Sequence, residues 1–432
     1  MDRHFAFRVL ACTSAVLLGL GMPTAQARKA AAPKQATAAA PAAIGNIEVE
    51  LDHQLGEDKD AQLRKLIERF NAQSTEGKIV VSTRPWGQGS LPHMTIVSEQ
   101  DEDLFLDNKS RFKPLWQVMK DAKVPLAGAP SKYMVPSVVD SSNRLQALPI
   151  ALSSPVLFYN KDLLTKLGVN EADVPRTWSA WINVLGRFYT QGVRCPITVS
   201  QPVFNLYENA SLWNNQPLTT GGKSEQFAGN GLVQIKHMAM MASWRKAGFL
   251  YYYGRGNEAE AHFAAGECGA MIAPSGAYPS LVRQASFQVG VTSYPYHDDA
   301  YGAPARTVAD GPALWVANGK SAAEYRLIAH FIQFWLQPDS QVEWQVNAGY
   351  LPLNKAGSLA ATDSALLRNE TAATRVALAE LSNKPSPAAT AFTHKVGVRR
   401  ILAEEIEQVF DDKKPPKQGL DDAVQRIRTS VR

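Results

Sequence analysis

The order of segments that follows residue 45 is the feature that most constrains the fold. Residues 46–51 (N-I-E-V-E-L) alternate apolar and polar side chains as a strand does, and apolar residues then recur at helical spacing from Leu63 to Phe70. Further strands are predicted at 78–83 (K-I-V-V-S-T) and 94–97 (M-T-I-V). Strand, helix and strand in this order form the repeating unit of a parallel sheet covered by helices. The sequence therefore predicts an α/β fold.

The connection between Thr83 and Met94 is unusual for such a fold. It reads R-P-W-G-Q-G-S-L-P-H, which is rich in turn formers and too short for a covering helix. A helix is therefore expected to be missing there.

Later segments predict a second lobe. An extended stretch P-V-L-F-Y-N-K-D follows Leu148, and then a helix with Thr177 as its N-cap and one apolar face. A further strand is predicted at 311–316 and a strongly periodic helix at 322–336. With 432 residues, of which 45% are apolar, the chain is long enough for two lobes.

The N-terminal residues have the three zones of a secretory signal peptide. Arg3 and Arg8 precede an apolar run, and A-Q-A ends at Ala27, so cleavage is expected after residue 27. Residues 28–45 are almost entirely Ala, Lys, Pro, Gln and Thr, which predicts a disordered leader. No later segment approaches the roughly 20 apolar residues of a membrane span. The mature protein is therefore expected to be soluble and periplasmic.

Removal of the signal peptide leaves two cysteines, Cys195 and Cys268. Export favours a disulfide, but two buried, unbonded thiols remain an alternative, since bonding depends on geometry. The net charge of +5 is modest and lies partly in the leader, so no nucleic-acid partner is expected.

The sequence lacks the common enzyme signatures. The zinc-protease H-E-x-x-H, the P-loop, a complete G-x-G-x-x-G and G-x-S-x-G are all absent. The eight histidines are scattered without zinc-ligand spacing, and most are expected at the surface. We therefore expect no enzyme activity, no catalytic residues, no metal and no cofactor. An exported two-lobed α/β protein without such signatures suggests capture of a solute between lobes.

Five stretches resemble the periplasmic glycerol-3-phosphate-binding proteins of bacterial ABC importers, part of the larger group that includes maltose-binding protein. The resemblance runs in the same order from about residue 46 to the C-terminus. The stretches are S-S-P-V-L-F-Y-N-K-D (153–162), H-F-A-A-G-E-C-G-A-M (262–271), D-G-P-A-L-W-V (310–316), G-Y-L-P-L-N-K-A (349–356) and R-R-I-L-A-E-E-I-E (399–407).

The resemblance implies a set of ligand-binding residues. Arg399 would hold a phosphate with its planar fork of donors, and Gly311 would let a backbone N–H approach the anion. Hydroxyl groups from three further positions would donate hydrogen bonds, and a carboxylate would accept bonds from the glycerol end. These residues are Ser153, Ser275, Tyr350 and Glu99.

Departures from the family concern the aromatic residues. A family tyrosine in the shortened 84–93 segment has no secure counterpart, and Trp86 is the nearest aromatic residue. The G-W-x-G-W motif is replaced by S-Q-P-V-F, which leaves Phe204 where one tryptophan stood, while Trp213 is retained. Loss of a ring enlarges the predicted pocket away from the phosphate. We therefore expect it to accept glycerophosphocholine as well as glycerol-3-phosphate, with cation–π contact from Phe204 or Trp213.

The resemblance also implies how the protein works. Lobe 1 is expected to comprise residues 46–157 and 308–356, and lobe 2 residues 158–307 and 357–432, with a hinge of crossing strands between them. The protein is expected to be a monomer, and its closed form would deliver its solute to a membrane permease that works with an ATPase. The alternative is the same fold with an uncharged oligosaccharide as ligand. A phosphodiesterase would require metal ligands or a nucleophile with its base, and the sequence shows neither.

Overall fold

A computed structural model describes the chain from residue 45 onward, with gaps. The described residues are 45–84, 89–98, 111–126, 138–140, 142, 144–220, 226–351, 353, 372–383 and 397–430. The predicted signal peptide, almost all of the predicted leader, Trp86 and Glu99 lie outside these ranges. Among the described residues, no helix has both the length and the apolar character required to cross a bilayer.

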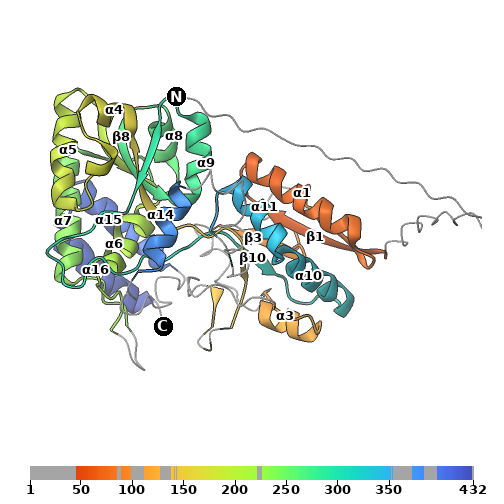
Figure 1. Ribbon diagram of the computed structural model, residues 1–432. Helices are drawn as coiled ribbons and strands as arrows, with labels where there is room; N and C mark the ends of the chain where they lie inside the picture. The colour runs from red at the N-terminus through yellow and green to blue at the C-terminus, as the bar shows by residue number, and fades with distance from the viewer. Residues whose placement is uncertain are drawn as a thin grey trace, which may run out of the picture. The chain divides into compact units, whose positions relative to one another are not determined.

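Two five-stranded sheets form the framework, and the α/β prediction is confirmed (Figure 1). The strands of sheet one, in spatial order, are β2 (Gly77–Val81), β1 (Ile47–His53), β3 (Met94–Val97), β10 (Ala313–Val316) and β4 (Leu148–Pro149). Those of sheet two are β7 (Leu250–Tyr251), β6 (Cys195–Val199), β8 (Cys268–Pro274), β5 (Pro155–Asn160) and β9 (Val289–Thr292).

The predicted strand, helix and strand unit opens sheet one. β1 pairs in parallel with both β2 and β3, and β10 then runs antiparallel between β3 and β4. No helix occurs between β2 and β3 in the residues described there, as the turn-rich connection predicts.

Helices with one apolar face cover each sheet. α1 (Glu57–Gln73) buries the four predicted apolar residues, which are at most 5% exposed: Leu63, Leu66, Ile67 and Phe70. α1 packs beside α10 (Ala322–Trp335) and α11 (Pro338–Ala348), while α3 (Leu115–Asp121) lies against α10. α10 begins at a capping box in which Ser321 and Glu324 satisfy each other's backbone N–H groups.

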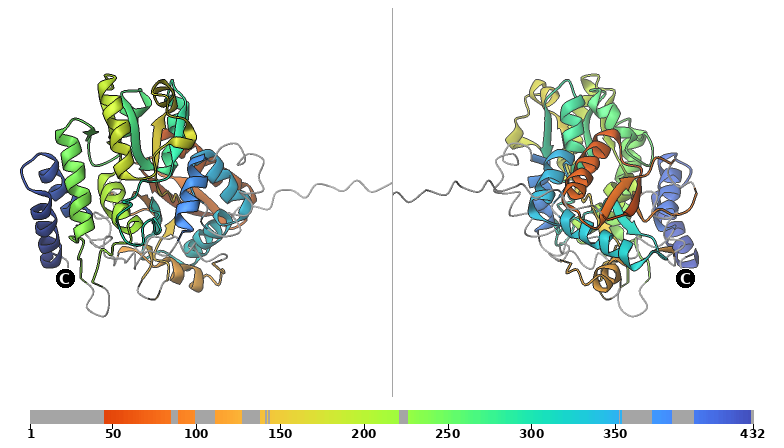
Figure 2. Two further views of the ribbon diagram at one scale, coloured as in Figure 1. Left: turned by 60° about the vertical axis from the view of Figure 1, so that its left-hand side comes forward. Right: turned by 90° about the vertical axis from the view of Figure 1, so that its right-hand side faces the viewer.

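Sheet two carries a larger set of helices. α5 (Trp178–Thr190) starts at the predicted N-cap Thr177 and packs its apolar face into the lobe-two core. Figure 2 shows α7 (Leu232–Lys246) beside the two C-terminal helices, α15 (Val398–Phe410) and α16 (Pro416–Ser430). The remaining helices are α4 (Lys161–Lys166), α6 (Asn209–Trp213), α8 (Glu258–Ala264), α9 (Tyr278–Gln284), α14 (Ala372–Leu381), the short turns Glu171–Asp173 and Ser275–Ala277, and the π-helical turn Val203–Glu208.

A disulfide joins Cys195 to Cys268. These residues are direct partners on the adjacent parallel strands β6 and β8, with Cα atoms 4.4 Å apart. The alternative of two unbonded thiols is thereby excluded, and the bond lies entirely within sheet two.

The prediction that most histidines lie at the surface is wrong for the pair His237 and His297. Each is only 3% exposed, and Nδ1 of His237 lies 3.1 Å from Nε2 of His297. Both pack against the buried Trp178 ring. Their sequence positions, on α7 and in a loop, gave no periodic signal of burial.

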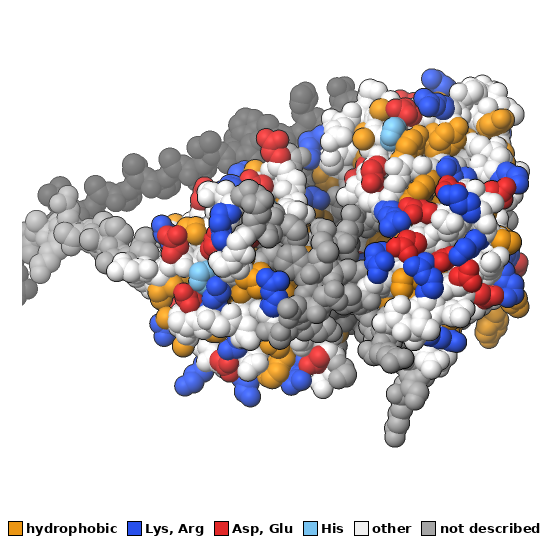
Figure 3. Space-filling model, turned by 180° about the vertical axis from the view of Figure 1, so that it is seen from behind, with side chains coloured by type: hydrophobic (Ala, Val, Ile, Leu, Met, Phe, Trp, Pro, Cys, Tyr) orange, Lys and Arg blue, Asp and Glu red, His pale blue; other side chains and the backbone are white. Residues whose placement is uncertain are grey.

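On the face seen in Figure 3, Lys and Arg side chains are interspersed with Asp and Glu. Oppositely charged side chains also form ion pairs, such as those of Lys414 with Glu405 and Asp422. Interspersed charges of both signs agree with the modest net charge of the chain.

Candidate functional site

Three stretches of chain, distant in sequence, pair where the two lobes are connected. Ser153 and Asp310 exchange two backbone hydrogen bonds of 2.9 Å, and the N–H of Leu351 donates to the carbonyl of Leu152 at 2.7 Å. The segments that precede Pro155 and Gly311 therefore lie side by side, joined by a third near residue 350. The crossing strand expected at 155–159 is instead β5 of sheet two. The lobe boundaries themselves stay a prediction.

Several predicted ligand residues meet at this crossing. Ser275 follows the buried strand β8, and its N–H donates to the carbonyl of Ser154 at 2.8 Å, while its hydroxyl oxygen accepts from the Ser154 N–H at 3.3 Å. A Cβ on Gly276 would lie 3.0 Å from the Tyr350 ring and 3.5 Å from Cβ of Ser153. Ser153, Ser275 and Tyr350, predicted from separate motifs, are thus close neighbours.

Gly311 has a backbone that requires glycine. Its φ is +155°, and a Cβ there would lie 1.8 Å from the carbonyl oxygen of Ala151. A side chain would therefore collide with the neighbouring crossing segment, and glycine is the residue that fits. Its N–H donates to Oδ1 of the adjacent Asp310 at 2.9 Å.

Arg399 projects from the first turn of α15 into a cluster of acidic groups. Its Nε and Nη2 donate to the two carboxylate oxygens of Glu208, each at 2.9 Å, and Nη2 also forms an ion pair with Oδ2 of Asp310. The Arg399 side chain is 17% exposed, whereas those of Glu208 and Asp310 are each 3% exposed. The guanidinium also lies 5.6 Å from the centroid of the Phe204 ring.

The electrostatics of this cluster follow from burial. Desolvation is the main cause that raises the pKa of Glu208, and the nearby Asp310 carboxylate adds to the rise, while Arg399 opposes it. Glu208 is held by the π-helical turn Val203–Glu208, in which every residue is buried. Asp310 instead belongs to a crossing segment that leads into β10 of sheet one. The cluster therefore connects the two lobes.

Residues 65–368 match the family described as bacterial extracellular solute-binding protein. The sn-glycerol-3-phosphate-binding periplasmic protein UgpB of Pectobacterium atrosepticum is 30% identical over 408 residues, which are 88% of this chain and 90% of that protein. The chain belongs to the bacterial extracellular solute-binding proteins.

Further relatives and solved structures agree with this assignment. UgpB of Escherichia coli strain K12 is 29% identical over 406 residues, 87% of this chain and 90% of that protein. The crystal structure of Mycobacterium tuberculosis UgpB with glycerophosphocholine has a TM-score of 0.72 at 17% identity and covers 89% of this chain and 98% of that one.

The maltotriose-bound MalE domain of Bdellovibrio bacteriovorus has a TM-score of 0.68 at 14% identity and covers 89% of this chain and all of that one, 100%. At such identities the solved structures show the fold alone, which is the two-lobed fold of maltose-binding proteins. This solute-binding protein is therefore not an enzyme by family, in agreement with the missing catalytic signatures.

Two predicted ligand residues of this solute-binding protein are buried and contact other parts of the protein. The Trp213 ring is 4% exposed and its Nε1 donates to the carbonyl of Tyr294 at 2.8 Å. The Phe204 ring is 4% exposed and faces Arg399. Their role in ligand binding stays a prediction, as does that of Glu99 and Trp86, which lie outside the described residues.

Sequence reasoning missed three charged residues of this region. Glu208 and Asp310 both contact Arg399, and Nζ of Lys59, at the start of α1, lies 4.8 Å from the centroid of the Tyr350 ring. Asp310 stood inside the motif D-G-P-A-L-W-V, so its place beside the predicted Gly311 was the one available signal.

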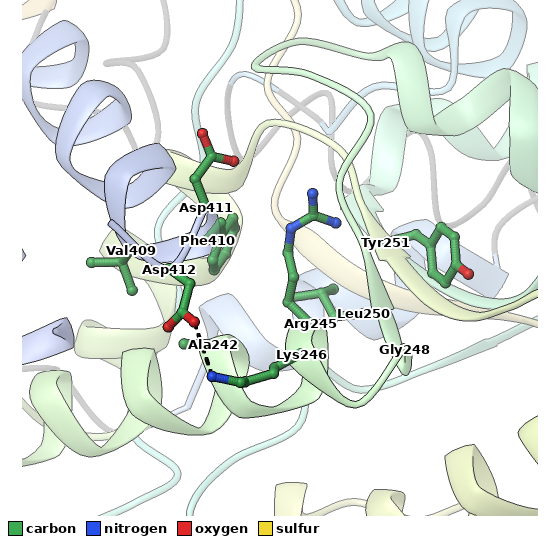
Figure 4. A pocket seen from close by; sticks show the side chains of 10 residues that line it. All are labelled: Ala242, Arg245, Lys246, Gly248, Leu250, Tyr251, Val409, Phe410, Asp411 and Asp412. Atoms are coloured by element: carbon green, nitrogen blue, oxygen red, sulfur yellow. Dashed lines mark hydrogen bonds and ion pairs between the residues drawn. The ribbon is translucent and has the colours of Figure 1, made fainter. Parts of the chain in front are cut away.

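A pocket of about 430 Å³ lies elsewhere on lobe two, between the end of α7, β7 and the end of α15 (Figure 4). Its lining includes Arg245, Leu250 and Phe410, and Lys246 forms an ion pair with Asp412 at its edge. Phe410 is at the opposite end of α15 from Arg399, roughly 16 Å along the helix axis. This pocket contains none of the predicted ligand residues.

Proposed function

We propose that this solute-binding protein captures phosphate esters of glycerol for an ABC importer, either sn-glycerol-3-phosphate or a glycerophosphodiester such as glycerophosphocholine. The observation that carries the proposal is the meeting of Ser153, Ser275, Gly311 and Tyr350 at the crossing segments, with Arg399 bound to the adjoining Asp310. Hydroxyl groups, a backbone N–H beside a glycine and a guanidinium are the donors that suit a phosphate ester. The names of the UgpB relatives support the same ligand class.

Binding would close the lobes, since a ligand held from both lobes stabilises the closed state over the open one. The closed protein would then present its solute to a membrane permease that works with an ATPase. Export to the periplasm through residues 1–27 and a monomeric state complete the proposal. The periplasmic designation of the relatives supports it.

The test is a thermal-shift and calorimetry screen with glycerol-3-phosphate, glycerophosphocholine and maltodextrins. A phosphate ester is expected to raise the melting temperature by mass action. A shift with maltodextrins and none with either phosphate ester would instead favour the oligosaccharide alternative. Hydrolysis of the diester by the purified protein would contradict the proposal that it only binds its solute.

The residue test is Arg399→Lys. Lysine keeps a positive charge for the buried Glu208 but loses the planar fork, so affinity for phosphate esters is expected to fall roughly 10- to 100-fold. The matched control is Arg400→Lys, because Arg400 is the next residue of α15, its side chain is 61% exposed and it pairs with Glu404 one turn along the same helix. Equal affinities of the two variants would remove Arg399 from the site.

A further inference from the structure

The Asp310 carboxylate occupies the position that sequence reasoning assigns to the ligand anion. Its Oδ2 forms an ion pair with Arg399, and its Oδ1 accepts the N–H of Gly311 at 2.9 Å. Arg399 and a backbone N–H at Gly311 are two of the donors that the family resemblance assigns to the ligand anion. One buried carboxylate therefore bridges both.

The two acidic partners of Arg399 differ in how they are held. Glu208 takes two donors of the guanidinium with both oxygens and comes from the same lobe, so it fixes the orientation of Arg399. Asp310 contacts the guanidinium through one oxygen and comes from a segment that crosses between the lobes. The backbone hydrogen bonds of Asp310 to Ser153 do not involve its carboxylate. Its side chain can therefore turn away from Arg399 without loss of the crossing pair.

The charges of this cluster do not favour a strongly anionic ligand. Arg399 contributes one positive charge, and the two carboxylates oppose it with two negative charges when both are ionised. A phosphodiester brings one further negative charge, whereas a phosphate monoester brings between one and two near neutral pH, since its second pKa is about 6. Like charges in a site of low exposure repel strongly. The repulsion is therefore greater for the monoester.

We propose that Asp310 is a specificity-determining residue of the ligand site, which an anionic ligand must displace from Arg399 and Gly311. The proposal rests on the proposed function, because it assumes that the ligand is a phosphate ester. The displaced carboxylate remains close to the bound phosphate, so it penalises a dianionic monoester more than a monoanionic diester. Asp310 thereby sets the protein's preference for phosphodiesters.

The experiment compares Asp310→Ala with the wild type by calorimetry at pH 8, with glycerol-3-phosphate and glycerophosphocholine as probes. The variant is expected to bind the monoester at least about tenfold more tightly and the diester with a smaller gain. Asp310→Asn, which preserves side-chain shape and removes the charge, is expected to change both affinities in the same direction. Asp299→Ala is the matched control, because Asp299 is an exposed aspartate that pairs with Lys236.

The outcomes separate this inference from the proposed function. If the wild type binds neither phosphate ester, the proposed function fails. If the wild type binds and both Asp310 variants have unchanged or weaker affinity for the monoester, the inference is overturned while the function stands. An equal gain for both ligands overturns the charge discrimination. Thermal melts establish whether each variant is folded. If Asp310→Ala does not fold, the comparison of Asp310→Asn with the wild type decides the test.

Discussion

Two buried imidazoles connect the stability of lobe two to pH. Burial is the main cause that lowers the pKa of His237 well below its usual value, and the neighbouring His297 lowers it further. Burial likewise lowers the pKa of His297 from 6.5 to about 4, with a smaller contribution from Lys236. Both rings are therefore neutral in the folded protein, whereas in the unfolded chain they are protonated below about pH 6.5.

The free energy of unfolding is consequently expected to be intact above pH 6.5 and to fall as the pH drops toward 4, because the unfolded chain then binds more protons. At pH 5 the titration of His297 is expected to remove about 2 kcal/mol, and that of His237 acts in the same direction. Urea titrations at pH 7.5 and pH 5 measure this loss. It is expected to be smaller in His297→Gln and unchanged in His330→Gln, whose histidine is 40% exposed. The same loss in both variants would contradict this origin.

Gly311 is expected to tolerate no side chain. Alanine there would meet the Ala151 carbonyl at 1.8 Å and would have to keep a φ of +155°. Gly311→Ala is expected to destabilise the protein by about 3 kcal/mol. Gly319→Ala, which has a φ of +77° but open space around the added Cβ, is expected to cost only about 1 kcal/mol. Chemical denaturation distinguishes the two, and equal losses would show that space at Gly311 is not limiting.

Site residues that belong to a sequence motif could be predicted, whereas the residues that contact them could not. Gly311 and Arg399 stood in motifs, and the structure brings their neighbourhoods together. Glu208 carried no signature, and Asp310 had only its place beside Gly311 in the motif D-G-P-A-L-W-V, because a carboxylate becomes buried only when distant segments have folded around it. That both carboxylates contact the guanidinium of Arg399 could therefore be learned only from the structure.

At the scale of elements, the disulfide is the strongest local constraint. It joins β6 to β8 across a sequence separation of 73 residues. In the chain-entropy account, a cross-link over such a loop stabilises the folded state by about 4 kcal/mol. Dithiothreitol is therefore expected to lower the urea midpoint of the wild type. A Cys195→Ala, Cys268→Ala double variant is expected to have that lower midpoint already, and dithiothreitol is expected to leave it unchanged. A further drop with dithiothreitol would show that the reagent acts on the protein other than through this disulfide.

Elements with strong periodic or capping signals were predicted closely. β3 has the predicted bounds, and α5 and α10 begin directly after Thr177 and Ser321. The short strands β7 and β4 were not predicted, because two residues carry no periodicity and depend on their neighbours for pairing. The predicted strand at 311–316 begins two residues later, at Ala313, because Gly311 and Pro312 belong to the crossing segment.

At the scale of the molecule, ligand capture is expected to change the dimensions of the protein. If contacts from both lobes hold the ligand, saturating glycerophosphocholine is expected to reduce the radius of gyration measured by small-angle X-ray scattering. Arg399→Lys is expected to show no reduction at the same concentration, and Arg400→Lys is expected to behave as the wild type. A ligand that binds without any change in the wild type would contradict hinge closure.

The two-lobed architecture followed from the resemblance rather than from local patterns. The order of elements predicted an α/β fold, but hydrophobic periodicity does not say which of two sheets a strand will join. β10 illustrates this point, because it follows every strand of sheet two in sequence yet pairs with β3 and β4. Pairings between such distant segments depend on the whole chain.

That late strand has a consequence for synthesis. All five strands of sheet two, from β5 to β9, leave the ribosome before β10, which lies between β3 and β4 in the finished sheet one. The nascent N-terminal half must therefore wait with an unpaired β3 edge while the second sheet is completed, and such an edge invites association with other chains. Protection of the β3 edge until residue 316 has been synthesised is accordingly expected to favour folding over association.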